Sequence, residues 1–351
     1  MLPQTLMKNR FEDFVRFLMD SYRVMAPVAK GPQFAYAEIE TPEEISKIRM
    51  DYDQTILPPK KILFPQHEQL LKFSGPGPEG VEVVAEVQAT AILGAHPYDL
   101  RGLATTDAAY CQDPLDPTYK ARREAAFLIG LNIRQYINEH QFMADMNALE
   151  APEGSFDLML TDLGDRYYVE VGSEAGSQLL KASGCGAAAT ADDHKAKQAY
   201  DAERDANCPK KLPYNLRYLP ELLEQSYDSL LWDAVAKRCF SCGTCTNVCP
   251  TCYCFDVQDK LTMDATSGVR ERKWDSCQLK VFAEVAGGEN FRERTPSRLR
   301  HRMFRKGKFI LERTGQAGCV GCGRCSKHCV ASISILEAFQ QIADQAVALD
   351  T

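Results

Sequence analysis

Eleven of the fourteen cysteines in this 351-residue chain lie between Cys239 and Cys329, at spacings typical of iron–sulfur ligands. Two runs, starting at Cys239 and at Cys319, share the pattern C-x2-C-x2-C-x3-C. In such a run three closely spaced thiolates surround one [4Fe-4S] cube, and the offset fourth thiolate ligates the other cube. The first cluster is therefore predicted on Cys239, Cys242, Cys245 and Cys329. The second is predicted on Cys319, Cys322, Cys325 and Cys249.

Zinc is the main alternative for these cysteines, because pairs of C-x2-C also build tetrahedral four-cysteine sites. A zinc site has no use for the third C-x2-C step or for the offset fourth cysteine, so two [4Fe-4S] clusters are favoured. Gly243, Gly321 and Gly323 agree with that interpretation. A chain that wraps tightly around a cube needs residues without side chains and backbone N–H groups that face the sulfur.

Three further cysteines, Cys252, Cys254 and Cys277, lie between the two runs. They either hold an additional metal site, such as a third cluster with a fourth ligand from Cys208 or elsewhere, or they are buried thiols. Buried free cysteine is common in protein cores, so the second interpretation is favoured. The cysteines of the first half of the chain are also expected to be plain thiols: Cys111, Cys185 and Cys208.

Helices are expected on either side of the cysteine runs. Leucines at helical spacing predict a helix over 219–235 that leads into the first run, and 333–349 predicts another after the second. Residues 214–351 are therefore expected to form a mainly helical, ferredoxin-like dicluster [4Fe-4S] domain. The basic segment from Arg292 to Lys308 is either a solvated face that offsets the charge of the clusters or a docking site for an acidic partner.

The first half of the chain mixes helical and strand patterns, so residues 1–177 are expected to form a mixed α/β domain and the whole chain an α+β fold. Residues 178–213 are rich in Gly, Ala and charge and are predicted to be a linker region. The patterns predict helices over 4–25 and 119–134, strands over 34–39, 61–64, 81–87 and 90–93, and a hairpin over 158–171.

Composition and charge exclude several classes of protein. An apolar fraction of 45% and a charged fraction of 25% indicate a folded globular chain. The net charge of −7 argues against a nucleic-acid binder that works by neutralising phosphates. No apolar stretch approaches the ~18 residues of a membrane-spanning helix, and the first residues lack the pattern of a secretory signal. A cytoplasmic protein without a transmembrane segment is expected, and its thiols then serve metal or redox chemistry.

The cysteine runs, together with the segments 250–257 and 272–277, resemble the family of iron–sulfur beta subunits of sulfhydrogenase and the related iron–sulfur subunits of anaerobic sulfite reductase. Segments 58–66, 122–124 and 168–173 are similar to phrases of the same family, and the resemblance covers most of the chain. It implies an electron-transfer subunit of a cytoplasmic oxidoreductase complex in anaerobic metabolism. Its neighbours would be a flavin-, NAD(P)- or ferredoxin-linked subunit and a catalytic subunit, such as a hydrogenase or a heterodisulfide or sulfur-compound reductase.

The chain departs from this family at one set of positions. Many members carry further cysteines in the first half, where this chain has Tyr98, Ile133 and the segment 141–143. A metal held there in relatives is expected to be absent here.

The sequence contains no G-x-G-x-x-G after a strand, no P-loop and no H-E-x-x-H. We therefore predict no catalytic residue and expect the protein to move electrons without performing the terminal chemistry. One alternative is a catalytic iron–sulfur oxidoreductase whose N-terminal domain binds its own flavin or substrate. Another is a non-catalytic redox or iron sensor, which would need a labile, exposed cluster.

Overall fold

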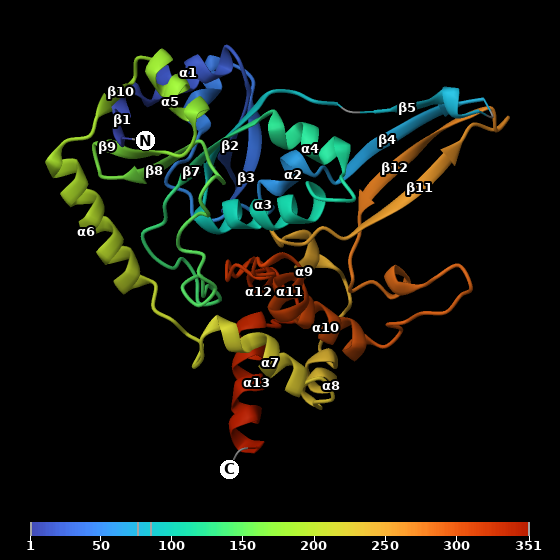
Figure 1. Ribbon diagram of the computed structural model, residues 1–351. Coiled ribbons are helices and arrows are strands. Elements are labelled where there is room, and N and C mark those ends of the chain that lie inside the picture. Colours follow the sequence, from blue (N-terminus) through green and yellow to red (C-terminus); the bar gives the residue numbers. More distant parts are fainter. Residues whose placement is uncertain (1, 76, 85, 350–351) are drawn as a thin grey trace.

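The computed structural model describes residues 2–75, 77–84 and 86–349 and combines helices and strands throughout (Figure 1). Within these residues the larger sheet has the strand order β10-β1-β9-β8-β7-β6-β2-β3. Its strands are β1 (Gln4–Met7), β2 (Arg23–Lys30), β3 (Gln33–Ile39), β6 (Thr90–Ala95), β7 (Ala126–Leu131), β8 (Leu158–Asp162), β9 (Arg166–Val171) and β10 (Gly186–Ala188).

The centre of this sheet is parallel and its edges are antiparallel. Strands β2, β6, β7 and β8 run parallel to their neighbours, whereas β3, β9, β1 and β10 are joined to the sheet antiparallel. Parallel strands are usually buried on both faces, and β6 is buried at every position. Because side chains alternate along a strand, Ala91 and Leu93 enter the core on one face and Ile92 enters the core on the other.

Helices cover both faces of the larger sheet (Figure 1). The face of Ala91 packs against α1 (Phe11–Met19) and α5 (Glu174–Ala182). The face of Ile92 packs against α2 (Lys60–Leu63), α3 (Pro97–Tyr110) and α4 (Pro117–Glu124). Their buried side chains, such as Phe14 of α1 and Leu103 of α3, point into the two cores. The first half is thus a three-layer arrangement.

The structure corrects three of the local predictions. The helix predicted over 4–25 is only nine residues long, because β1 precedes α1 and β2 follows it. The strand predicted over 61–64 is the short helix α2, which begins directly after Pro59. The helix predicted over 119–134 ends at Glu124, and β7 follows it. Short apolar runs do not separate helix from strand by periodicity alone, and here tertiary pairing decided between them.

A second sheet projects from the body as an arm (Figure 1, right). Its strands are β4 (His67–Ser74), β5 (Val81–Val83), β11 (Phe255–Leu261) and β12 (Ser267–Trp274), in the order β11-β12-β4-β5. Strand β12 from the second half of the chain pairs antiparallel with β4 from the first half. The arm therefore joins two regions that are far apart in sequence.

The second half contains the remaining helices and the cysteine runs. They are α7 (Leu219–Gln225), α8 (Leu231–Ala236), α9 (Thr244–Asn247), α10 (Thr295–Phe304), α11 (Ile310–Thr314), α12 (Arg324–Lys327) and α13 (Ile335–Leu349). Short 3-10 segments occur at Lys8–Arg10, Pro42–Lys47, Pro78–Gly80, Leu216–Tyr218 and Lys280–Ala283, and Arg305–Phe309 is a π-helical turn. The mixed fold is confirmed, but a mainly helical second domain is not, because β11 and β12 belong to it.

The two halves share one hydrophobic core. Tyr98, Phe142 and Met146 of the first half pack with Trp232 and Phe339 of the second. The predicted linker region 178–213 contains the end of α5, strand β10 and helix α6 (Ala191–Asn207), and β10 pairs with β1. The division into residues 1–177, 178–213 and 214–351 stays a prediction. Among the described residues, no helix combines the length and the apolar character needed to cross a bilayer.

Candidate metal centre

The two cysteine runs adopt the same backbone conformation. Gly243 and Gly323 have positive φ angles of 80° and 73°, and each begins a short helix, α9 or α12, that carries the third cysteine of its run. Two residues earlier, Ser241 and Gly321 also have positive φ angles, of 53° and 65°. Only glycine adopts this region without strain, so Ser241 is held there by its surroundings. The repeated geometry gives each run an equivalent loop around its sulfur atoms.

Backbone N–H groups in these loops face sulfur. The amide of Ser241 donates to Sγ of Cys239 and the amide of Gly321 donates to Sγ of Cys319, both at 3.4 Å. A Cβ atom on Gly321 would lie 2.5 Å from the carbonyl oxygen of Phe142, so the loop can approach the first half of the chain only without a side chain. Amide donors to sulfur stabilise thiolate charge and help to set the potential of a bound cluster.

Two neighbouring cavities collect the eight cysteines of the runs in the predicted crosswise groups. The first cavity is lined by three cysteines of the first run and one of the second: Cys239, Cys242, Cys245 and Cys329. The second is lined by three of the second run and one of the first: Cys319, Cys322, Cys325 and Cys249. Cys325 and Arg302 line both cavities. The structure brings these side chains together, and their ligation of iron stays a prediction.

The buried thiols have pKa values that free solution does not give. Burial raises the pKa of Cys245 to about 11 and that of Cys319 to about 12. Hydrogen bonding with Thr244 lowers the pKa of the exposed Cys242. A thiol binds metal only as the thiolate, so a bound cation must supply the free energy that deprotonates the buried members. Among the described residues, no three His, Cys, Asp or Glu side chains are close enough to hold a single metal ion.

Two buried cations adjoin the cavities without a carboxylate partner in the part of the chain that the structure describes. Arg302 is 4% exposed, and its Nε atom has no hydrogen-bond acceptor. Lys306 is 3% exposed and donates from Nζ to Oγ1 of Thr251 at 2.6 Å. Burial lowers the pKa of both groups, but nearby thiolates raise it by more. Uncompensated buried charge is costly, so this donor set fits an anionic cluster, which carries about −2 with its four thiolates.

The basic segment 292–308 is only partly the solvated face that was one of its two expected roles. Arg298, Arg302 and Lys306 recur every four residues along α10 and the following turn, and all three are buried. Arg298 donates to the carbonyl oxygen of Gln278 at 2.9 Å and to Oγ of Ser241 at 3.0 Å. It thus holds the loop that presents the first cysteines. The spacing of four was present in the sequence and could have identified this inward stripe.

A fourth buried cation approaches from the first half of the chain. Lys60 of α2 is 3% exposed, donates from Nζ to the carbonyl oxygen of Cys252, and lies 4.4 Å from the centre of the Trp274 ring. Burial lowers the pKa of Lys60 to about 8, against the opposing effect of the thiolates of Cys252 and Cys249. Nothing in the local sequence pattern singled out this residue.

The three additional cysteines do not converge on one point. Cys252 lies beside Cys249, and Cys254 lies beside Cys277. Hydrogen bonding from Cys254 lowers the pKa of Cys277. The three therefore form two separate contacts at the edge of the second cavity, and a further metal site on Cys252, Cys254 and Cys277 stays a prediction. The other cysteines lie elsewhere: Cys111 is half-buried, and Cys185 and Cys208 are buried.

Tyr98 and Ile133, at positions where the sequence departs from the resembled family, lie in one apolar cluster. They pack together with Phe142 and Met143 beside Cys319 and Cys322. These side chains fill the space between the second cavity and α3 with apolar atoms. The second cavity is thereby separated from solvent on the side of the first half of the chain.

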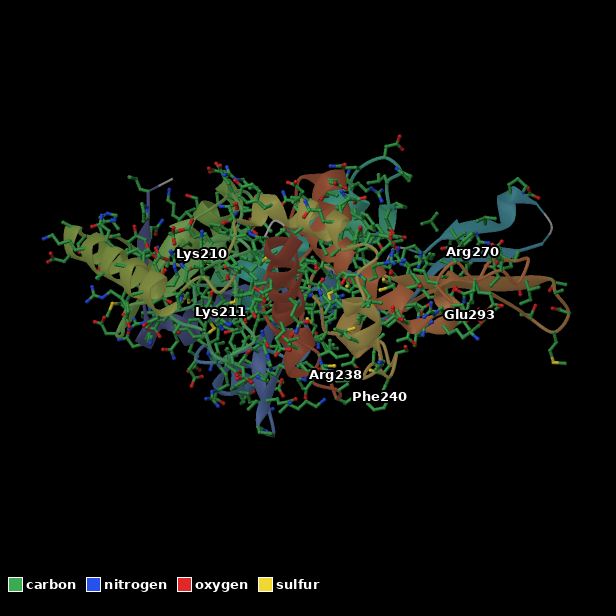
Figure 2. All side chains as sticks on the ribbon, turned by 90° about the horizontal axis from the view of Figure 1, so that it is seen from below. Lys210, Lys211, Arg238, Phe240, Arg270 and Glu293 are labelled. Carbon is green, nitrogen blue, oxygen red and sulfur yellow. The ribbon has the colours of Figure 1, made fainter. Side chains whose placement is uncertain are left out.

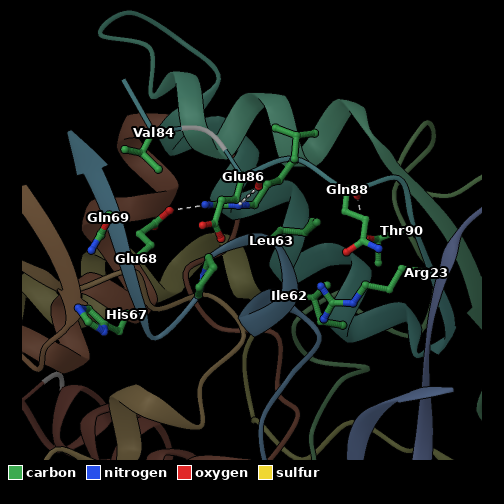
Figure 3. A pocket seen from close by; sticks show the side chains of 13 residues that line it. Arg23, Ile62, Leu63, His67, Glu68, Gln69, Val84, Glu86, Gln88 and Thr90 are labelled. Atoms are coloured by element: carbon green, nitrogen blue, oxygen red, sulfur yellow. Dashed lines mark hydrogen bonds and ion pairs between the residues drawn. The ribbon is translucent and has the colours of Figure 1, made fainter. Parts of the chain in front are cut away.

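Two larger hollows lie in the first half of the chain. One, of about 770 Å³, lies between the larger sheet and the base of the arm (Figure 3). Arg122 and Glu68 form an ion pair of 2.5 Å there. The other, of about 460 Å³, lies at the carboxyl ends of β6, β7 and β8 and is lined by His96, Asn132 and Asp162 among others. Ligands of open α/β sheets usually bind at that edge.

Comparison with known proteins points in the same direction as the geometry. A family profile described as a 4Fe-4S dicluster domain matches residues 238–333. The chain is also 32% identical over 336 residues to sulfhydrogenase 2 subunit beta of Pyrococcus furiosus. That alignment covers 95% of this chain and 96% of the relative.

Proposed function

The chain belongs to the family of sulfhydrogenase beta subunits, and on that premise we propose that it is an electron-transfer subunit carrying two [4Fe-4S] clusters. Cys239, Cys242, Cys245 and Cys329 would hold the first cluster. Cys319, Cys322, Cys325 and Cys249 would hold the second. The clusters supply one-electron redox chemistry when bound. The observation that carries the proposal is the grouping of the eight side chains around two adjoining cavities, each with one cysteine from the other run.

The residues around the cavities define what the polypeptide contributes. Buried Arg302 borders both cavities, so its positive charge acts on both redox centres. The amides of Ser241 and Gly321 stabilise sulfur charge, and the apolar wall of Tyr98 and Phe142 excludes water from the second cavity. Hydrogen bonds, charge and burial are the means by which a protein sets a cluster potential.

The proposed complex contains this chain between two kinds of partner. One is a flavin-, NAD(P)- or ferredoxin-linked redox subunit, and the other is a catalytic subunit, namely a hydrogenase or a heterodisulfide or sulfur-compound reductase. A hetero-oligomer is supported by the relative, which is named as a subunit of a sulfhydrogenase. The proposal includes the cytoplasmic location expected from the sequence.

Iron and sulfide analysis of the chain, purified without oxygen together with its associated subunits, tests this function. About eight irons and eight sulfides per chain are expected, and about twelve would indicate a third cluster on the additional cysteines. A colourless protein loaded with zinc would refute the proposal. The co-purified subunits would identify the reaction.

A second candidate function rests on the hollow at the carboxyl ends of β6, β7 and β8. His96 lies there with Nδ1 3.0 Å from the carbonyl oxygen of Leu131 and its ring stacked 4.3 Å from that of Tyr52. Gln54, two residues from Tyr52, donates to the carbonyl oxygen of Cys322 at 2.7 Å and so connects this edge to the second cavity. A catalytic oxidoreductase with its own flavin or substrate would use this hollow. A flavin that remains bound to the isolated chain would favour it.

A further inference from the structure

The two cavities are equivalent in backbone but not in cover. In the second cavity, Val320 lies between the first two cysteines of its run and is 2% exposed. Its counterpart in the first run is Phe240, which is 73% exposed. The residue after the fourth cysteine shows the same contrast, because Pro250 is buried and Val330 is 74% exposed.

The cover over the second cavity comes from the first half of the chain. Pro250 packs against Gly102 of α3, where an added Cβ would lie 2.6 Å from Cβ of Pro250. Gly321 packs against the backbone of Phe142. Within the described residues, the chain provides no such cover for Phe240 and Val330, although both line the first cavity. Cys242, a predicted ligand in the same wall, is exposed. The first cavity therefore has an apolar mouth at the surface.

The charge beside this mouth is positive. Lys237 and Arg238, which directly precede the first run, are exposed, and neither forms an ion pair in the described part of the chain. No Asp or Glu occurs in residues 237–250 or 319–331. Figure 2 shows Arg238 and Phe240 close together at the edge of the molecule. An apolar centre with a charged rim is the usual composition of a transient protein interface. The rest of the chain is net acidic, so this local cationic rim is selective for a partner.

We propose that Arg238, Phe240, Cys242 and Val330 form the docking face for an acidic redox protein that exchanges electrons with the first cavity. This inference rests on the proposed electron-transfer function and assigns its point of contact. The partner presents carboxylates to Lys237 and Arg238 and an apolar surface to Phe240 and Val330. The second cavity, which the chain itself covers, then exchanges electrons through the wall shared at Cys325 and not directly with this partner.

Stopped-flow electron transfer tests the docking face, with the dithionite-reduced, cluster-loaded chain and an acidic [2Fe-2S] ferredoxin as the probe. Arg238→Glu should slow the second-order reaction about fivefold or more at ~20 mM salt, and the difference should vanish at ~500 mM. Phe240→Ala should slow the reaction at both salt concentrations, because its contribution is apolar contact. Lys210→Glu is the matched control: it makes the same charge change at an exposed site that Figure 2 shows well away from Phe240.

Three results would overturn the docking face. The first is equal slowing by Lys210→Glu and Arg238→Glu, which would indicate only a net-charge effect. The second is unchanged rates for both Arg238→Glu and Phe240→Ala. The third is acceleration by Arg238→Glu at low salt. Iron content and the EPR spectrum of each variant are measured in parallel. Normal clusters with unchanged rates refute the docking face alone, whereas absent clusters in the unsubstituted chain refute the electron-transfer function itself.

Discussion

Arg324 and Asp99 form a completely buried ion pair across 225 residues of sequence. The guanidinium donates to the two carboxylate oxygens at 2.5 and 2.8 Å, and its Nε donates to the carbonyl oxygen of Thr55 at 2.9 Å. Arg324 lies between Cys322 and Cys325, whereas Asp99 lies in the first turn of α3. The ion pair therefore fixes the second cysteine loop to the first half of the chain.

Replacing Asp99 should destabilise the protein strongly. Asp99→Asn leaves the charge of Arg324 buried without a counter-charge, so we expect the free energy of unfolding to fall by about 3–5 kcal/mol. Asp51→Asn is the control, because its pair with Arg49 is exposed and should contribute less than about 1 kcal/mol. Urea unfolding under anoxic conditions, followed by circular dichroism, measures both. Equal losses in the two variants would contradict the role of the buried pair.

A double variant separates the pair from the packing around it. Asp99→Asn combined with Arg324→Met removes both charges, and we expect it to recover much of the loss, because an apolar replacement of a buried pair is often neutral. A double variant as unstable as Asp99→Asn alone would mean that Arg324 acts mainly through its hydrogen bonds to Thr55.

Replacing Arg302 should change both redox centres at once. Its guanidinium borders both cavities, and a nearby positive charge stabilises the reduced, more negative state of a cluster. Arg302→Met should therefore shift both midpoint potentials in the negative direction, by tens of millivolts. The measurement is a redox titration monitored by EPR. Arg300→Met on the same helix is the control, since Arg300 instead stacks 3.8 Å from the ring centre of Tyr227. Unchanged potentials in Arg302→Met, or equal shifts in both variants, would contradict this prediction.

Serine variants can test the crosswise assignment. If Cys329 and Cys242 serve one cluster, the double variant Cys329→Ser/Cys242→Ser should damage only that cluster and keep about four irons per chain. Cys329→Ser/Cys322→Ser should damage both clusters, because these residues line different cavities. If each run instead held its own cluster, the two results would be reversed. Cys208→Ser, a buried thiol outside both cavities, should keep about eight irons.

The spacing of the cysteines predicted the grouping of the candidate site because ligand spacing is a local property. Three thiols within seven residues can face one centre only in a tight loop, and Gly243 and Gly323 provide the backbone that this loop requires. The cations that adjoin the cavities were not predicted. The burial of Lys60 depends on tertiary packing of α2 against Trp274, and no local pattern reports such packing.

The fold was predicted in class but not in arrangement. Continuous apolar runs such as 90–95 indicated buried strands, yet the pairing of β6 between β2 and β7 depends on contacts between distant segments. The cluster-bearing half was expected to be mainly helical because the helical leucine pattern dominates it. The pairing of β12 with β4 adds a sheet that includes a strand from the other half.

The stability of the protein should depend on pH through His301. Burial lowers the pKa of His301 from 6.5 to about 4, and the neighbouring charges of Arg292 and Arg305 act in the same direction. The folded chain therefore keeps the imidazole neutral between pH 6.5 and 4, while the unfolded chain takes up a proton. Stability is fully present above pH 6.5 and is lost as pH falls toward 4, by on the order of 1–2 kcal/mol. His301→Gln cannot titrate, so its unfolding free energy should fall less than that of the unsubstituted chain between pH 7 and pH 5. Anoxic urea titrations at the two pH values measure this difference. Equal losses in the two proteins would assign the acid sensitivity to other groups, because only the titration of residue 301 differs between them.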